Sequence, residues 1–373
     1  MGAPSEVLGR RALSRATLAR QFLLERDDRS AAEAIEHLVG LQAQAPDAPY
    51  VALWSRLSGF RTDDLATLLL DRAAVRMSLY RATIHLVTAR DCLRLRPLIQ
   101  VVLERSFAGS PFAKYLDGVD MAALVQAGRT AVDEEPRTRG GLREVLLERW
   151  PDRDPDSLAY AITYNVPMVQ LPPRGIWGQR GAVAWTSTEN WLGCKQEVPG
   201  PSALDDLVLR YLGAFGPGSV KDAQLWSGLT RLREVFDRLV AAQALRSFRD
   251  EAGVELYDLP DAPRPEADRP APPRFLPEYD NLLLSHAERS RIIEDGRPVP
   301  LPPGNGGAIG TLLVDGFFRA TWRVTRSDDS ATLTVEPFAS LPGADADAVT
   351  EEGQQLLDFV APGASHDIRF AVP

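Results

Sequence analysis

Apolar residues recur at helical spacing over much of the first 110 residues. Ser14 precedes an apolar pattern that continues to Leu23, and Ser30 precedes a second pattern in residues 31–41. A serine hydroxyl can accept a hydrogen bond from a backbone N–H of the first helical turn, so both serines are predicted N-caps. Pro46 is expected to close the second helix.

The rest of this stretch alternates between helical and extended patterns. Residues 75–80 and 82–89 are rich in β-branched and apolar residues, which predicts a hairpin. Two short helices are expected before it and one long helix after it, capped by Thr88 and running over residues 90–107. The order of helices followed by a hairpin is typical of a winged-helix module.

The same order occurs twice more, in residues 117–195 and 200–260. The third stretch shows it most clearly, because Ser219 and Thr230 are predicted N-caps of two helices that precede a hairpin. No repeat is visible at the level of sequence identity, so the comparison rests on pattern alone.

A proline-rich linker at 261–274 precedes a mostly β region, with strands expected at 290–295 and 308–316 among others. We therefore expect an α+β fold of about three tandem winged-helix domains with a small C-terminal β-barrel or sheet. The predicted domain ranges are 1–115, 116–198, 199–262 and, for the linker with the β-rich domain, 263–373.

Composition restricts the cellular setting. No apolar run approaches the roughly 18 residues that a membrane helix needs, and the N-terminal residues lack a signal-peptide pattern. The two cysteines, Cys92 and Cys194, form neither a disulfide framework nor a zinc motif. Three of the 42 basic residues are lysines and 39 are arginines, a bias typical of a high-GC genome such as that of an actinobacterium. We expect a cytoplasmic protein, and no heptad seam predicts a coiled-coil dimer, so a monomer is expected.

Charge is unevenly distributed along the chain. The net charge is −9, yet residues 1–110 carry 15 arginines against 12 acidic residues, a net +3, which leaves −12 for the remainder. An acidic protein can still present a basic groove to DNA, because association depends on the local field.

Several function classes lack their motifs. The chain contains no GxGxxG, GxxxxGK[ST], HExxH or GxSxG sequence, and its four histidines are far apart in sequence. We therefore expect no nucleotide cofactor, no metal ion and no serine nucleophile.

The most unusual local feature is Gln42-Ala43-Gln44, at the end of an otherwise apolar helix pattern. On a regular helix the two amides would point about 200° apart. They converge only if the helix unwinds, which Pro46 favours by restricting the residue before it. One interpretation is a solvated helix end. The other is a pair of neutral amides that hold a water molecule or stabilise a developing cation.

The residues around this pair resemble a known family. HLVGLQAQAPDAPYVALWSRL, LYRATIHLVTARDCLRLRP, LPPRGIWG and FLPEYDNLLLSHAERSRII, distributed over residues 37–295, are similar to the HTH_42 winged-helix family. Its characterised members are the AlkZ-type bacterial DNA glycosylases. Gln42 and Gln44 match the Gln-x-Gln form of that family's catalytic pair.

The resemblance implies a C-shaped scaffold around duplex DNA. It also implies excision of N7-alkylated guanine, and in some members the unhooking of interstrand crosslinks that genotoxic natural products make, as self-resistance of the producing strain. The expected partner is then double-stranded DNA that carries alkylated guanine. Alkylation at N7 already weakens the glycosidic bond, so positioning water suffices and two glutamines fit that task.

Other polar residues are weaker candidates for contacts with DNA. Two interpretations stay open for each of these residues. A strand histidine is either packed in the core or faces DNA, an arginine either lies on the surface or binds phosphate, and a polar hairpin tip is either a plain turn or a contact with DNA. The carboxylates of Glu278 and Asp280 either stabilise the structure or activate water. The DNA-binding candidates are Arg81, His85, Arg174, His286, Arg289 and Arg291.

Three functions from different classes fit these features. The first is a monofunctional DNA glycosylase, since no lysine lies near Gln42 to form a Schiff base. The second is a non-catalytic winged-helix DNA-binding protein or transcription regulator. The third is a protein that sequesters a drug.

Overall fold

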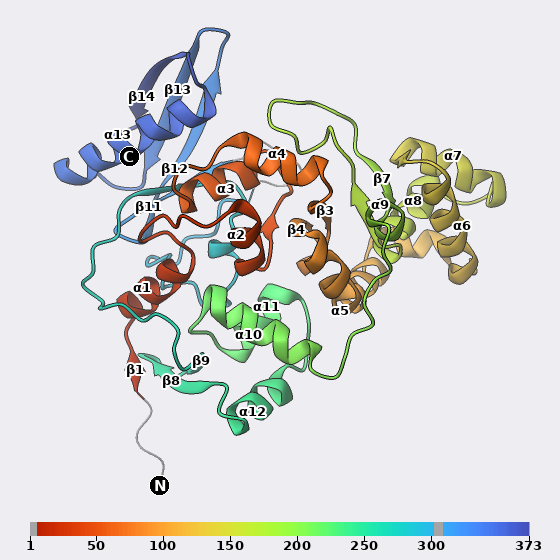
Figure 1. Cartoon of the computed structure of the whole chain (residues 1–373), viewed down its shortest axis with the longest axis horizontal. Coiled ribbons are helices and arrows are strands. Elements are labelled where there is room, and N and C mark those ends of the chain that lie inside the picture. Colours follow the sequence, from red (N-terminus) through yellow and green to blue (C-terminus); the bar gives the residue numbers. More distant parts are fainter. Residues whose placement is uncertain (1–5, 302–308, 373) are drawn as a thin grey trace.

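The computed structural model describes residues 6–301 and 309–372. Residues 1–5 of the expected first domain, and Ala308 at the start of an expected strand, lie outside the described residues. Figure 1 shows a central sheet with helices on both sides, a helical lobe at one end and a second sheet with its own helix at the other. None of the described helices is long and apolar enough to cross a membrane.

The central sheet joins segments from the first two expected domains. Its six strands are ordered β2-β4-β3-β6-β7-β5, and Arg76 of β3 pairs with Gln170 of β6 across the expected boundary between those domains. One hydrogen-bonded ladder therefore connects both parts. The strands are β2 (Leu41–Gln42), β3 (Ala74–Ser78), β4 (Ile84–Thr88), β5 (Arg137–Thr138), β6 (Met168–Gln170) and β7 (Ala184–Ser187).

Two predicted helix limits at the N-terminal end are wrong. Ser14 lies buried inside the first helix, whose N-cap is Gly9. The second helix begins at the predicted N-cap Ser30, which forms a capping box with Glu33, but it ends at His37, well before Pro46. The helices here are α1 (Arg10–Arg20), α2 (Ala31–His37), α3 (Ala48–Arg56), α4 (Thr62–Leu70) and α5 (Ala89–Ala108), the last capped by Thr88 as predicted.

The second helical group packs around its own apolar core. Leu124, Leu142 and Ile162 are fully buried there, and each comes from a different helix. Gly128 lies where a Cβ atom would come within 2.3 Å of Ile162, so a larger residue would separate two of these helices. The helices are α6 (Met121–Glu134), α7 (Arg139–Arg149), α8 (Pro155–Asn165) and α9 (Thr188–Leu192).

The third group shows the expected helix–turn–helix followed by a hairpin. Ser219 and Asp222 form the capping box of its second helix, which Gly228 ends in left-handed geometry. The third helix begins after Leu232, so Thr230 is not its cap. The hairpin carries a third, parallel strand from the N-terminus. The elements are α10 (Ala203–Phe215), α11 (Val220–Ser227), α12 (Arg233–Ala241), β8 (Arg246–Asp250), β9 (Glu255–Asp258) and β1 (Val7–Leu8).

The C-terminal region is an open sheet with a helix packed against it. In the described residues β10 and β14 are its two edges and do not pair, so the sheet is not a closed barrel. The strand expected at 290–295 is absent from the structure, and β14 was not predicted. The elements are β10 (Arg274–Leu276), β11 (Gly310–Val314), β12 (Phe317–Arg326), β13 (Ser330–Pro337), α13 (Gly343–Val360) and β14 (Ser365–Phe370).

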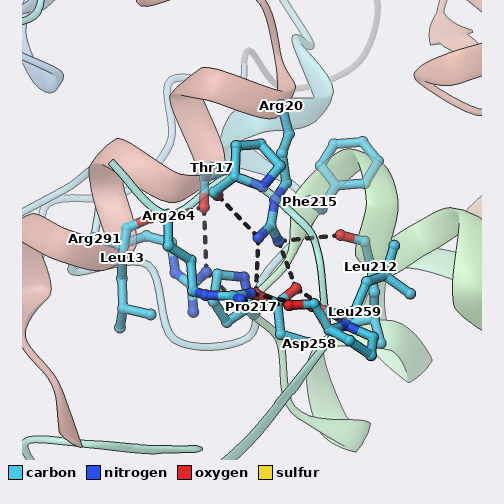
Figure 2. Close-up of polar contacts among 12 residues, drawn as sticks. Leu13, Thr17, Arg20, Leu212, Phe215, Pro217, Asp258, Leu259, Arg264 and Arg291 are labelled. Carbon is cyan, nitrogen blue, oxygen red and sulfur yellow. Dashed lines mark hydrogen bonds and ion pairs between the residues drawn. The ribbon is translucent and has the colours of Figure 1, made fainter. Parts of the chain in front are cut away.

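A buried ion pair connects α1 to the third helical group, as Figure 2 shows. The guanidinium of Arg20 donates to both carboxylate oxygens of Asp258 at 2.8 Å, and Arg264 donates to the same carboxylate at 2.5 Å. Both Arg20 and Asp258 are almost fully buried. A charge pair removed from water in this way requires close geometry, so it fixes the relative placement of segments more than 200 residues apart.

Candidate active site

A sharp backbone reversal brings Gln42 into the sheet. Val39 and Gly40, directly after α2, have φ angles of +56° and +95°. A Cβ atom at position 40 would lie 2.7 Å from the Cγ1 atom of Val87, so only glycine fits there. The two glutamines therefore lie on a strand and the bend that follows it, and not on the predicted helix end.

The strand ladder is interrupted at Ala43, and side chains replace its backbone contacts. The Ala43 N–H donates to the Ile84 carbonyl at 2.7 Å. The Ile84 N–H does not return to Ala43 but donates to Oε1 of Gln44 at 3.3 Å. The freed Ala43 carbonyl instead accepts from Nη2 of Arg76 at 2.8 Å.

The two glutamines occupy different environments. Gln42 is 8% exposed, and its Oε1 atom accepts from Nη2 of Arg81 at 2.6 Å. Gln44 is exposed and lines a cavity. Both amide oxygens accept hydrogen bonds from the β3–β4 connection, one from the Arg81 side chain and one from the Ile84 backbone.

The cavity beside Gln44 has a volume of about 780 Å³ and lies on one face of the central sheet. Its floor comes from neighbouring strands, whose register places Arg76, Gln170 and Trp185 in one row across the sheet. Its far wall comes from the helical lobe, with Tyr160 and Tyr164 of α8. The cavity therefore lies between the first two expected domains.

The cavity is cationic, although the chain as a whole is acidic. No aspartate or glutamate is among the described residues that line it, whereas Arg76, Arg139 and Arg174 do. Arg76 is 2% exposed and makes no ion pair with a described carboxylate, and burial lowers its pKa to about 10, which leaves it charged at neutral pH. The Arg139 guanidinium lies over the Tyr160 ring, 4.7 Å from its centroid. Such a wall suits phosphates and stacked bases.

Arg81 lies in a buried network behind the cavity. It is half-buried in η1 (Tyr80–Ala82), and its guanidinium donates to three protein oxygens. Besides Gln42, these are the Trp226 carbonyl at 2.7 Å and Oδ1 of Asn281 at 3.0 Å. The predicted contact of Arg81 with DNA stays a prediction, and these bonds favour a role inside the protein.

His85 is fully buried in β4, directly opposite Gln42 in the ladder. Its Nδ1 atom lies 3.0 Å from the Thr83 carbonyl, which can only accept, so Nδ1 carries the proton. Burial, followed by the charge of Arg81, lowers the pKa of His85 to about 3. The histidine is therefore neutral at physiological pH, and among the described residues its Nε2 atom has no partner.

Of the remaining DNA-binding candidates, His286, Arg289 and Arg291 lie close together, because, after burial, the charges of both arginines contribute to lowering the pKa of His286. Arg174 lines the cavity. His286 and Arg291 are 1% and 3% exposed and bond to the carbonyls of Phe215 and Pro217, so burial argues against DNA contacts by either residue.

Arg289 is half-buried. Its charge contributes to lowering the pKa of Arg81, after burial as the larger cause. Its proposed contact with DNA stays a prediction, as do those of the other candidates.

The sequence left open whether Glu278 and Asp280 stabilise the structure or activate water, and in the structure their environments differ. Asp280 is buried and accepts two hydrogen bonds of 2.9 Å from Arg56, which assigns it a structural role. Glu278 is half-buried and makes no ion pair with any described residue. Burial, and then the charge of Asp47, raise the pKa of Glu278 above its usual value.

Sequence analysis did not identify Arg76, Asn281 or Tyr160 as site residues. Arg76 is the one charged residue of the strand AVRMS, and a charge inside a strand buried on both faces was an available sequence signal. No comparable signal marks Asn281, because its partners Gly40 and Arg81 lie at least 200 positions away in sequence.

The fold and the cavity define a protein with a cationic cavity, which has aromatic side chains in its wall and the neutral amide of Gln44 in its lining. A family model described as DNA glycosylase AlkZ-like matches residues 35–359. The chain therefore belongs to the AlkZ-like DNA glycosylase family, and it is a DNA glycosylase. No curated protein matches the chain.

Among solved structures, the chain is similar to the DNA glycosylase AlkZ of Streptomyces sahachiroi. The TM-score is 0.72 at 18% sequence identity, and the alignment covers 98% of this chain and 100% of that one. At this identity the likeness shows the fold: a mixed α+β architecture is shared along the whole length.

Proposed function

We propose that this enzyme hydrolyses the N-glycosidic bond of N7-alkylated guanine in double-stranded DNA. It acts as a cytoplasmic monomer, and Gln42 and Gln44 form its catalytic pair. The observation that carries this proposal is the position of Gln44, whose amide lines a cationic cavity of about 780 Å³ in a DNA glycosylase fold.

The chemistry requires little acid catalysis. Alkylation at N7 gives the guanine a positive charge, so the base leaves as a neutral molecule when the bond from N9 to C1′ breaks. Water then adds to C1′ and releases a proton to solvent. The protein must hold that water and stabilise the cationic sugar, and a neutral amide oxygen can do both without titrating.

The amide geometry supports this role. The Ile84 N–H can only donate, so the atom of Gln44 that faces it is the carbonyl oxygen. A carbonyl oxygen has two lone pairs, and this contact uses one of them. The second lone pair is available to a water molecule or to the sugar inside the cavity.

A monofunctional reaction fits the lining of the cavity. A lyase step needs an amine nucleophile, and no lysine is among the described residues that line the site. We infer that the product is an abasic site.

The cavity also suits a bulky substituent on the base. Tyr160, Tyr164 and Trp185 offer aromatic surface for stacking, and the volume exceeds what one methyl group would fill. Unhooking of an interstrand crosslink, as self-resistance to a genotoxic natural product, is part of the proposal. The Streptomyces sahachiroi protein is named a DNA glycosylase, and that name supports base excision here.

The test uses a duplex oligonucleotide with a single N7-methylguanine and an excess of enzyme. Free base is quantified by chromatography, and abasic sites by alkaline cleavage. We expect base release by the wild type and a loss of about 100-fold in the rate for Gln44→Ala, as for other positioned polar groups in active sites. Gln42→Ala should also be slow.

Gln355→Ala is the matched control, because Gln355 is an exposed glutamine of α13 and does not line the cavity. It should keep the wild-type rate. Full activity of the Gln42→Ala, Gln44→Ala double variant would refute the site assignment. Tight binding of undamaged DNA without base release would instead support a non-catalytic DNA-binding protein.

A further inference from the structure

The connection between β3 and β4 adopts an unusual backbone conformation at Arg81. Arg81 and Ala82 have φ angles of +54° and +57°, two consecutive left-handed residues that both carry a Cβ atom. Such a conformation is unfavourable for these residue types and persists only when surrounding contacts enforce it. The hairpin turn contributes to this, since the Thr83 N–H donates to the Tyr80 carbonyl at 3.1 Å, and the contacts of the Arg81 guanidinium are further interactions that hold the turn.

The contacts of Arg81 and Asn281 close a ring with the backbone segment from Gly40 to Gln42. The Nη2 atom of Arg81 donates to Oε1 of Gln42 at 2.6 Å and to Oδ1 of Asn281 at 3.0 Å. The Nδ2 atom of Asn281 donates in turn to the Gly40 carbonyl at 3.3 Å. Strand β2 is therefore held at two points, at the Gly40 backbone and at the Gln42 amide.

The ring also fixes which way the Gln42 amide faces. A guanidinium has no acceptor, so the atom of Gln42 that faces Arg81 must be its carbonyl oxygen. The NH2 group of Gln42 then points away from Arg81. Without this contact, the two orientations of the amide would compete.

The charge of Arg81 is not neutralised by the protein. Its three acceptors are the Gln42 amide, the Asn281 amide and the Trp226 carbonyl, and it forms no ion pair with a described carboxylate. Burial lowers the pKa of Arg81 to about 10, so it remains a cation at neutral pH. A cation on the carbonyl oxygen polarises the amide and strengthens its N–H groups as donors.

We propose that Arg81 and Asn281 are positioning residues that hold the Gln42 amide in one orientation for base release, and that Arg81 acts through Gln42 rather than through contact with DNA. This inference rests on the proposed function. It goes beyond that function because it assigns a role to two residues outside the cavity.

The test is a double-mutant cycle in the single-turnover assay, with the rate constant at saturating enzyme measured separately from the affinity for DNA. We expect Arg81→Ala and Gln42→Ala each to lower the rate constant by about 10- to 100-fold, the range for a lost charge-assisted hydrogen bond. The Arg81→Ala, Gln42→Ala double variant should be no slower than Gln42→Ala alone. The affinity for DNA should change less than about twofold, because no phosphate contact is lost.

Two further variants keep the test decisive if Arg81→Ala folds poorly. Arg81→Lys retains the charge but cannot reach Gln42, Asn281 and Trp226 together, so it should remain slow. Asn281→Ala should lower the rate constant by several-fold, since it removes one side of the ring. Added guanidinium chloride at low concentration should partly restore the rate of Arg81→Ala, which a merely structural defect would not allow.

Arg96→Ala is the matched control. Arg96 is fully buried, whereas Arg81 is half-buried. Like Arg81, it forms no ion pair with a described carboxylate, and it donates to a glutamine Oε1 atom, that of Gln100, and to the Tyr164 carbonyl. It should lose stability to a similar degree and keep its rate constant within about twofold.

The failures are distinguishable. Multiplicative effects in the double variant, or an Arg81→Ala defect confined to DNA affinity, would overturn the positioning role. A Gln42→Ala variant at full rate would refute the assignment of Gln42 in the proposed function. A wild-type protein that releases no base would refute the proposed function itself.

Discussion

Two groups of buried and half-buried arginines differ in the atoms to which they donate hydrogen bonds. At the junction of Figure 2, Arg20 and Arg264 share the carboxylate of Asp258. Beside Gln42, Arg81 donates only to neutral oxygens, and no described carboxylate forms an ion pair with it. The first group contains a carboxylate counter-charge, which two arginines share, and the second contains none.

An arginine with a carboxylate partner and an arginine without one are expected to contribute differently to stability and to function. A buried charge without a counter-charge is costly, so the contacts that it makes must outweigh the loss of its hydration. Perturbed charges of this kind concentrate at functional sites, where the substrate or a catalytic group makes use of them. The cavity arginine Arg76 belongs with Arg81 in this respect, since its acceptors are also neutral.

The largest expected effect comes from breaking the group that contains the carboxylate. Asp258→Asn removes the counter-charge of the buried Arg20 and the half-buried Arg264, and it should lower the free energy of unfolding by about 3–5 kcal/mol. Urea denaturation measures this change. The base-release rate of the folded fraction should stay that of the wild type, because Asp258 lies outside the cavity.

Asp367→Asn is the control for this substitution, since its ion pair with Arg369 is exposed on both sides. It should cost less than about 1 kcal/mol. Equal stability losses in the two variants would show that burial does not distinguish the two ion pairs.

The second effect is a loss of stability in mild acid, to which the buried histidines His85 and His286 contribute. Burial lowers the pKa of His85, beside Arg81, to about 3, and lowers that of His286, beside Asp222, below its usual range. Between pH 6.5 and the lowered pKa values of the two histidines, these side chains bind a proton in the unfolded chain but not in the folded chain. The free energy of unfolding should therefore fall as pH drops below 6.5, by up to about 1.4 kcal/mol per pH unit for each histidine.

Chemical denaturation at a series of pH values checks this slope. His85→Gln and His286→Gln should each reduce the slope by the contribution of one proton. A slope that neither variant reduces would place the acid sensitivity elsewhere.

The smallest expected effect is on DNA affinity. Arg76→Ala removes from the cavity floor a guanidinium that forms no ion pair with a described carboxylate, so binding of undamaged duplex should weaken by about tenfold. The dependence of log affinity on log salt should become shallower by about one unit. Arg369→Ala, at an exposed position in β14 away from the cavity, should change neither quantity. Unchanged affinity in the Arg76→Ala variant would mean that DNA does not enter this cavity.

Sequence predicted most secondary structure because the determining contacts are local. The N-caps Ser30, Thr88 and Ser219 each bond to a residue three positions further on, and all three residues were predicted as N-caps. The predictions failed where distant packing decided. Ser14 looks like a cap but is buried inside α1, where it bonds to the Gly316 carbonyl.

The site was partly predictable. Gln42 and Gln44 were predicted from their spacing and from the family resemblance. Their backbone is a strand followed by a bend and not the expected helix end, because the chain reverses at Gly40, where the close approach of Val87 leaves no room for a Cβ atom. The cavity around Gln44 was not predictable, since its walls come from strands and helices of two expected domains that form one sheet.

The amino-acid sequence by itself determined the helices, the hairpins, the family resemblance and the pair of glutamines, all of which depend on neighbours within a few positions or on recognisable motifs. The tertiary structure alone decided which arginines have a carboxylate partner. Arg20 meets its carboxylate 238 positions away, and Arg81 meets Asn281 200 positions away without a carboxylate. Arginines with and without a carboxylate partner cannot be told apart in the sequence. Their electrostatic difference depends on burial and on the distance to a carboxylate, and only the folded chain defines both.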